Sequence, residues 1–215
     1  MSLRDYVAYV FDLDGTLFTI PVDWLNVREE VSKMAGAPIG DAPLFLKVEQ
    51  LISVRPSIRG SLFAMLDLAE SKAVAAATPI GGAFELLSRL SKAAKLGLVT
   101  MQGSSACDKI LGRHHLGELF DVLVTREDSL DRAAQLRIAL QALQSLPKDT
   151  LFIGDRLNDV ACGKIAGVDT VLVGRDPSGD TRPDYSFSAL AMLKEAVLED
   201  EAVPEGPEFS QGPRD

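Results

Sequence analysis

Short apolar runs alternate with amphipathic segments along most of this chain. The apolar runs are typical of buried strands and cover residues 6–10, 95–100, 121–125, 150–154 and 169–173. Segments with apolar residues at helical spacing predict helices over about 83–94, 104–112, 131–145, 158–166 and 188–198. Because strands and helices that alternate along a chain build a parallel sheet with helices on both faces, we predict an α/β fold.

The alternation stops between residues 19 and 78. Three amphipathic helical segments fill this stretch, with apolar positions at Trp24, Val27, Val31 and Met34, then Leu44, Val48 and Leu51, then Ile58, Leu62, Met65 and Ala69. We therefore predict an α/β core made of residues 1–18 and 79–200, which carries a small helical insertion at 19–78. The segment Phe18–Pro21 is expected to be the hinge of this insertion.

The composition is that of a globular protein with an acidic surface. The 215 residues are 47% hydrophobic and 25% charged, which suits one domain or one domain with an insertion. The formal net charge is −9 and the sequence pI is about 4.8. Nucleic acids and anionic membranes are themselves negative, so we expect neither as a partner. The sequence predicts no particular oligomeric state.

Other features predict a cytoplasmic location. Arg4 and Asp5 come early and carboxylates interrupt the following apolar run, so the amino terminus does not resemble a signal peptide. Two cysteines, Cys107 and Cys162, fall in predicted helices and suggest reduced thiols. The acidic end of the chain is rich in proline and glycine, and disorder is predicted for residues 201–215.

Candidate chemistry gathers where the predicted strands end. The first strand runs into Asp12, Leu13 and Asp14, and the strand at 150–154 is followed by Asp155. Alternation along an extended chain puts Asp12 and Asp14 on one side. Ligands of open α/β sheets bind at the carboxyl ends of the strands. Converging carboxylates repel unless a cation or a proton lies between them, which suits catalysis or metal binding, although a solvated turn is the alternative.

These segments resemble three motifs of the haloacid dehalogenase-like (HAD) phosphohydrolase superfamily. The matching stretches are Asp12-Leu13-Asp14-Gly15-Thr16, the strand that ends in Thr100, and Gly154-Asp155-Arg156-Leu157-Asn158-Asp159. The resemblance implies a HAD-like, Rossmann-like α/β core with a small inserted helical cap, and the phosphoglycolate phosphatase-like branch is a plausible analogy. It also implies that Asp12 is the nucleophile that becomes an aspartyl-phosphate and that Asp14 is the general acid and base.

The same resemblance implies a magnesium site and a phosphate grip. The carboxylates of Asp12 and Asp155 and the carbonyl oxygen of Asp14 would hold Mg²⁺, a cation that prefers oxygen ligands. Thr100 would bind the phosphate through its hydroxyl, together with the backbone N–H groups that follow, beginning at Met101. The helix that opens at Gly103 and Ser104 would add an amino terminus that favours anions. Asn158 and Asp159 are expected to support the metal site. The alternative for Asp159 is an acidic residue that only stabilises the amino terminus of the helix.

The sequence departs from the family at one position. Family members usually carry a lysine before the helix that leads into the fourth strand, and no lysine lies between Lys109 and Lys148. Arg132, in the first turn of the predicted helix, is the best substitute for this lysine. Arg126, on a less constrained loop, is the second. For each of them the alternative is an ordinary arginine on the protein surface. The cations of the insertion that could meet an anionic substrate are Arg28, Lys47, Arg55 and Arg59, although each could also be a solvated helix charge.

We therefore expect a Mg²⁺-dependent phosphatase that acts on a small phosphorylated metabolite, of which a phosphoglycolate-like ester is one candidate. A phosphomutase of the same fold is the nearest alternative, and it would require a phosphoenzyme that outlives one product. A non-catalytic binding protein on a HAD fold is the alternative of another class. The joint presence of Asp12, Asp14 and Asp155 speaks against it, since a degenerate member is expected to lose one of them.

Overall fold

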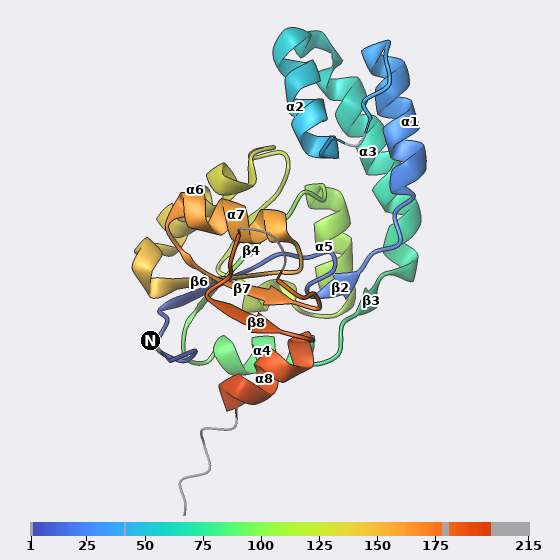
Figure 1. The fold of residues 1–215 in the computed structure, drawn as a ribbon. Coiled ribbons are helices and arrows are strands. Elements are labelled where there is room, and N and C mark those ends of the chain that lie inside the picture. Colours follow the sequence, from blue (N-terminus) through green and yellow to red (C-terminus); the bar gives the residue numbers. More distant parts are fainter. Residues whose placement is uncertain (1, 41, 178–180, 199–215) are drawn as a thin grey trace, which may run out of the picture.

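A six-stranded parallel sheet forms the centre of the molecule (Figure 1). The structure is a computed structural model that describes residues 2–40, 42–177 and 181–198. The strand order is β5-β4-β1-β6-β7-β8 and all neighbouring pairs are parallel. The predicted α/β fold with a parallel sheet is confirmed. The strands are β1 (Ala8–Phe11), β4 (Lys95–Val99), β5 (Val122–Val124), β6 (Thr150–Gly154), β7 (Asp169–Val173) and β8 (Tyr185–Phe187).

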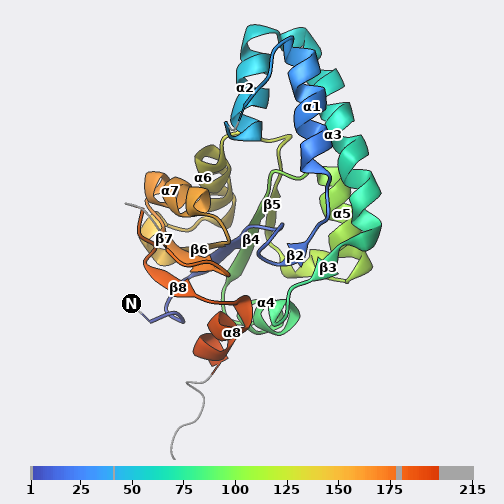
Figure 2. The same ribbon diagram turned by 45° about the vertical axis from the view of Figure 1, so that its right-hand side comes forward.

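Helices cover both faces of the sheet (Figures 1 and 2). Ala8 and Val10 of the central strand β1 face the side packed by α6 (Arg132–Leu143) and α7 (Leu157–Ala166). Tyr9 and Phe11 belong to the core on the opposite side, which contains α4 (Ala83–Leu90), α5 (Ser104–Arg113) and α8 (Leu190–Leu198). This alternation explains why β1 reads as a continuous apolar run, because both of its faces are buried.

Several boundaries differ from those expected. β1 begins at Ala8, two residues after the start of the apolar run, and α4 ends at Leu90, after which hydrogen-bonded turns continue to Ala94. The edge strand β8 was not predicted, because it has only three residues and no buried one. The residues 201–215, for which disorder was expected, lie outside the described part of the chain.

Three helices form the insertion between two very short strands. β2 (Phe18–Thr19) pairs antiparallel with β3 (Thr78–Pro79), and α1 (Trp24–Ala35), α2 (Leu44–Val54) and α3 (Arg59–Ala73) lie between them. We call residues 20–77 the helical insertion; it stands beside the carboxyl ends of the strands (Figure 1). Its interior holds fully buried apolar residues from all three helices, namely Val27, Val31, Val48, Leu62 and Leu66.

Two further observations bear on the environment of the chain. No helix in the described ranges has both the length and the apolar character that crossing a bilayer requires. Cys107 is buried and Cys162 is half-buried, and both thiols are free.

Candidate active site

The chain turns sharply at the carboxyl end of β1. The N–H of Asp12 still donates to the carbonyl of Ile153 in β6 (2.9 Å), and the turn then passes through Gly15 at a φ of +91°. A β-carbon at Gly15 would lie 2.6 Å from the carboxylate of Asp155. Only glycine tolerates both this φ and this approach. The turn places the side chains of Asp12 and Asp14 on one cleft.

The carboxyl end of β6 supplies two more carboxylates. Asp155 follows Gly154, and Asp159 in the first turn of α7 packs so closely on Gly154 that a β-carbon there would lie 2.6 Å from the Asp159 side chain. Ligand oxygens of Asp12, Asp155 and Asp159 lie within 4.8 Å of one another, and all three residues are buried. Buried Oδ1 of Asp155 accepts no hydrogen bond from the described residues. An all-oxygen set with an unsatisfied buried oxygen fits a hard divalent cation such as Mg²⁺.

Arg132 lies inside this acidic cluster. One arm of its guanidinium donates to Oδ1 of Asp12 (2.7 Å), and its Nε lies 3.4 Å from Oδ1 of Asp159. The other arm donates to the carbonyl of Val99 at the end of β4 (2.7 Å). Arg132 comes directly after the helix cap Asp131, so the start of α6 carries it to the edge of the sheet. The structure thus brings together the cation chosen from the sequence and the proposed nucleophile.

Burial shapes the proton affinities of the site. Burial raises the pKa of Asp12 to about 7; the neighbouring carboxylates also raise it, and Arg132 opposes them. Burial raises the pKa of Asp14, whose Oδ1 accepts the N–H of Ile20 (3.0 Å), a bond that lowers this pKa in part. Burial alone would lower the pKa of Arg132, but Asp12 and Asp159 outweigh it and raise the pKa, so the guanidinium stays charged. The site holds an excess of carboxylates over cations, which a divalent metal ion would balance.

Thr100 is held in place by its neighbours. Its carbonyl accepts Nε2 of the buried Gln135 (2.9 Å), and its hydroxyl accepts the N–H of Gln102 (3.1 Å). Because the hydroxyl oxygen already accepts a hydrogen bond, its own proton is available to a ligand. Thr100, Met101 and Gln102 all line the cleft. Gln135 was missed from the sequence, although its position one turn after Arg132 on the same helix could have indicated it.

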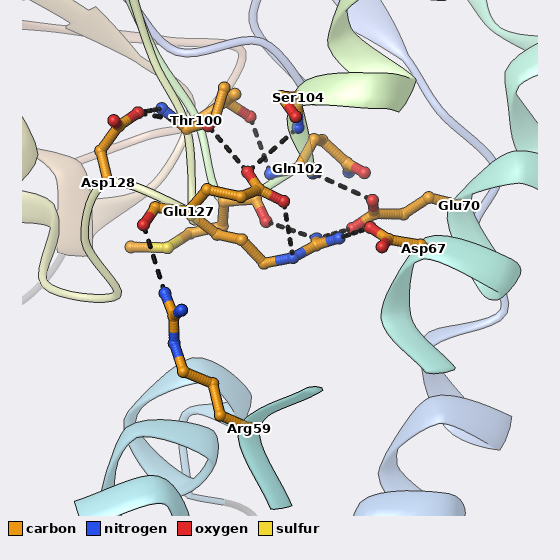
Figure 3. Close-up of polar contacts among 12 residues, drawn as sticks. Arg59, Asp67, Glu70, Thr100, Gln102, Ser104, Glu127 and Asp128 are labelled. Atoms are coloured by element: carbon orange, nitrogen blue, oxygen red, sulfur yellow. Dashed lines mark hydrogen bonds and ion pairs between the residues drawn. The ribbon is translucent and has the colours of Figure 1, made fainter. Parts of the chain in front are cut away.

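The start of α5 differs from the expectation of an anion-binding helix terminus. The N–H of Gly103 already donates to Oε2 of Glu70 (3.0 Å). The N–H of Ser104 donates to Oε2 of Glu127 (3.1 Å), and Figure 3 shows this bond. Two carboxylates of this chain therefore occupy donors that were expected to meet the phosphate. The role assigned to Gly103 and Ser104 in phosphate binding was wrong.

The other candidate cations are placed differently from one another. Arg126 was expected on a less constrained loop, but its side chain is fully buried against acidic residues of the insertion. Of the insertion's cations, Arg28 lines the cleft and donates both arms to the carbonyl of Ala42. The remaining three bond elsewhere, Lys47 to Gln50, Arg55 to the carbonyl of Met34 and Arg59 to the carbonyl of Glu127.

The cleft itself lies between the sheet edge and the helical insertion and has a volume of about 840 Å³. The polar and charged residues that the core contributes include Asp12, Asp14, Asp131, Arg132, Arg156, Asn158 and Asp159. The insertion contributes a mainly apolar wall, which includes the side chains of Trp24, Leu44 and Phe45. The rings of Trp24 and Phe45 meet edge to face at 5.9 Å. The side of the cleft that the core forms is therefore polar, and the side that the helical insertion forms is mainly apolar.

Comparison with known proteins gives relatives along nearly the whole chain. Residues 9–173 match the family described as haloacid dehalogenase-like hydrolase. A protein of Halalkalibacterium halodurans named pyrophosphatase PpaX is 28% identical over 212 residues, which cover 87% of this chain and 95% of that protein. The PpaX of Bacillus velezensis is 26% identical over 219 residues, with 90% and 97% covered.

Solved structures share the fold. A Lactobacillus plantarum protein whose description names phosphoglycolate phosphatase as its candidate activity superposes with a TM-score of 0.70 at 23% identity, over 91% of this chain and 100% of that one. A HAD-like hydrolase from Streptococcus pneumoniae superposes with a TM-score of 0.65 at 21% identity, over 88% and 97%. The family match, which spans most of the sheet and the candidate site, decides the assignment: the chain belongs to the haloacid dehalogenase-like hydrolase family.

Proposed function

We propose that this protein is a cytoplasmic, Mg²⁺-dependent phosphatase that hydrolyses a small phosphomonoester through an aspartyl-phosphate on Asp12. The observation that carries the proposal is the contact of Arg132 with Asp12 in a cleft that Asp14 and Thr100 also line. The names of the PpaX relatives support the transfer of a phosphoryl group to water as the reaction type. The two free thiols support a reducing compartment.

The proposed reaction has two steps on the side chains of this chain. In the first, Asp12 attacks phosphorus, the bond from phosphorus to the ester oxygen breaks, and Asp14 gives its proton to that oxygen. In the second, Asp14 takes a proton from water, the water oxygen bonds to phosphorus, and Asp12 leaves as a carboxylate with release of inorganic phosphate. Arg132 engages Oδ1 of Asp12, which leaves Oδ2 for the attack. The raised pKa of Asp14 helps it to hold the proton that the first step needs.

The residues fit a divalent cation. Asp12, Asp155 and the carbonyl of Asp14 would hold Mg²⁺, with Asp159 next to them. When bound, the ion supplies positive charge between an anionic nucleophile and an anionic phosphate. Thr100 and the N–H of Met101 would grip the remaining phosphate oxygens, while Arg132 neutralises charge that builds up in the transition state.

The shape of the cleft favours an organic ester as the substrate. Pyrophosphate is compact and highly charged, whereas the wall contributed by the insertion is apolar at Trp24, Leu44 and Phe45 and carries the carboxylate of Glu49. Arg28 is the cation of this wall, and the carbonyl of Ala42 already binds it. We therefore propose that the helical insertion acts as a cap that closes on the organic part of the substrate about the hinge Phe18–Pro21 and excludes water. Parallel assays of pyrophosphate and of a panel of small phosphate esters test this preference.

Removal of the metal is expected to stop hydrolysis. With p-nitrophenyl phosphate and small alkyl phosphates as substrates, activity should depend on Mg²⁺, be lost in EDTA and return when Mg²⁺ is added back. Ca²⁺ should inhibit, because it takes more ligands in looser geometry and would draw both oxygens of Asp12 into coordination. Equal rates with the two ions, or full activity in EDTA, would contradict the proposed site.

Loss of Arg132 is expected to damage catalysis strongly. Arg132→Ala should lower kcat/KM by about 10²-fold or more, roughly 3 kcal/mol of transition-state stabilisation, because it removes the cation that faces Asp12. Arg137→Ala is the matched control, since Arg137 is exposed on the same helix. Arg132→Lys keeps the charge but not the two-armed geometry, so it should recover part of the loss. Wild-type kinetics in a folded Arg132→Ala variant would refute the role.

A further inference from the structure

A buried ion-pair cluster joins the helical insertion to the core (Figure 3). At its centre is Arg126, which follows β5 and has no exposed surface. One arm of its guanidinium donates to Oε1 of Glu70 and the other to Oδ1 of Asp67, and both acids come from α3 of the insertion. Glu70 is 1% exposed, whereas the side chain of Asp67 is about half exposed. We call Arg126, Glu70 and Asp67 the ion-pair cluster.

The cluster also holds the loop that carries the proposed phosphate grip. We call residues 100–103 the substrate loop. Arg126 donates to the carbonyl of Met101 (3.2 Å), and Oε2 of Glu70 accepts the N–H of Gly103 (3.0 Å). The backbone N–H of Arg126 adds a long contact to the carbonyl of Gln102 (3.4 Å). Backbone groups of three successive loop residues are thus held by one arginine and its acidic partner.

These bonds set the direction of Thr100. In a trans peptide the C=O and N–H point in opposite directions. Because Arg126 draws the carbonyl of Met101 to one side, the N–H of Gln102 points to the other, where it donates to the hydroxyl of Thr100 (3.1 Å). Arg126 therefore acts on Thr100 through a single peptide unit, although it does not line the cleft itself.

The loop is built closely around the guanidinium. A β-carbon at Gly103 would overlap Nη2 of Arg126 and would lie 2.8 Å from Oδ1 of Asp67. A side chain at residue 103 would therefore separate the loop from the cluster. Burial raises the pKa of Glu70 and Arg126 opposes this, so a separation of the pair would leave a carboxylate buried without its cation.

We propose that Arg126 and Glu70 are positioning residues that couple the docking of helix α3 to the geometry of the substrate loop. The proposal rests on the proposed function only in taking this loop as the phosphate grip. When α3 is docked, the loop holds Thr100 and Met101 in place; when the ion pairs part, helix and loop loosen together. Because α3 belongs to the insertion, a swing of the cap about residues 18–21 that moves α3 away from the core would part the cluster and release the substrate loop.

Backbone amide exchange on the full-length protein tests the coupling without any need for activity. Arg126→Met should speed exchange both in α3 (59–73) and at residues 102–104 by about tenfold or more, because hydrogen bonds to charged groups are lost. Arg113→Met is the matched control. Arg113 also ties the core to the insertion, through the carbonyls of Val74 and Ala75, but does not touch the substrate loop. It should leave exchange at 102–104 unchanged.

A milder variant keeps the test decisive if Arg126→Met does not fold. Asp67→Asn alters only the half-exposed acid, and it should speed exchange in α3 and at 102–104 in the same proportion, by a smaller factor. Faster exchange in α3 with an unchanged loop, in either folded variant, would overturn the coupling. Faster exchange at 102–104 in Arg113→Met would also overturn it, since the loop would then respond to any loosening of the insertion.

Kinetics separate positioning from a merely structural role. With p-nitrophenyl phosphate and Mg²⁺, Arg126→Lys should raise KM by about tenfold, because a lysine cannot hold Glu70, Asp67 and Met101 at once. A loss of folded protein would lower the apparent kcat and leave KM unchanged, and that result would overturn the positioning role. If the wild-type protein hydrolyses no phosphate ester while loop and helix still exchange together, the coupling stands and the proposed function fails.

Discussion

Asp12→Asn is expected to leave no more than a trace of phosphatase activity in a protein that still folds. The carboxamide is a poor nucleophile, so the aspartyl-phosphate cannot form. The substitution keeps the shape of the side chain and one oxygen that can accept the hydrogen bond from Arg132. Mass spectrometry of acid-quenched wild-type protein, mixed with substrate and Mg²⁺, should find a phosphoryl group on the peptide that contains Asp12 and none in the variant.

The pH dependence of stability checks the same residue without catalysis. The pKa of Asp12 is raised in the folded protein to about 7, so the proton that it holds stabilises the metal-free fold at low pH. This contribution is complete below the unfolded pKa of 3.8 and is lost as the pH rises through about 7. In EDTA, the fall in melting temperature between pH 5 and pH 8 should therefore be smaller for Asp12→Asn than for the wild type.

Appreciable Mg²⁺-dependent turnover by the Asp12→Asn variant would rule out the covalent mechanism.

Asp14→Asn is expected to slow the reaction by about 10²- to 10⁴-fold, the usual loss when acid and base assistance is removed. Asparagine can still accept the N–H of Ile20, so the local turn should persist. Formation of the aspartyl-phosphate should suffer less with p-nitrophenyl phosphate, whose leaving group needs little protonation, than with an alkyl phosphate. The second step needs a base for every substrate, so the phosphoenzyme should accumulate in the variant and appear as a burst of p-nitrophenol.

Glu49→Gln gives the control for that experiment. Glu49 is another carboxylate that lines the cleft, but it comes from the insertion and has no role in the proposed chemistry. Its substitution should change kcat by no more than a few-fold. An Asp14→Asn variant that keeps full activity towards alkyl phosphates would exclude Asp14 as the acid and base.

Much of the fold could be predicted from local patterns, because each buried strand and each amphipathic helix has its own period. The patterns do not carry the strand order, and they miss β8, whose residues are few and only partly buried. The acidic edge was predictable because strands of a parallel sheet end at the same edge. Arg132 was within reach for the same reason, since α6 begins beside that edge.

Arg126 shows where prediction from the sequence stops. From the sequence, Arg126 was predicted as the second candidate cation for the site, after Arg132, on a less constrained loop. Its partners Asp67 and Glu70 lie 59 and 56 residues earlier, on a helix whose docking no local pattern encodes. The carboxylates that occupy the start of α5 were missed for the same reason, because Glu70 reaches Gly103 from 33 residues away. Contacts between the insertion and the core are set by tertiary packing alone.

The pairing of β2 with β3 has an evolutionary consequence. Thr19 lies directly opposite Thr78, so the helical insertion leaves and re-enters the core through neighbouring residues. A turn of about two residues can join such a pair, as it does in a hairpin. An ancestral gene could thus gain, lose or exchange the whole helical insertion without shifting the register of the sheet. Residue 126 would have to change with it, because the acids that neutralise Arg126 belong to the helical insertion. Residues 67, 70 and 126 should therefore be inherited together.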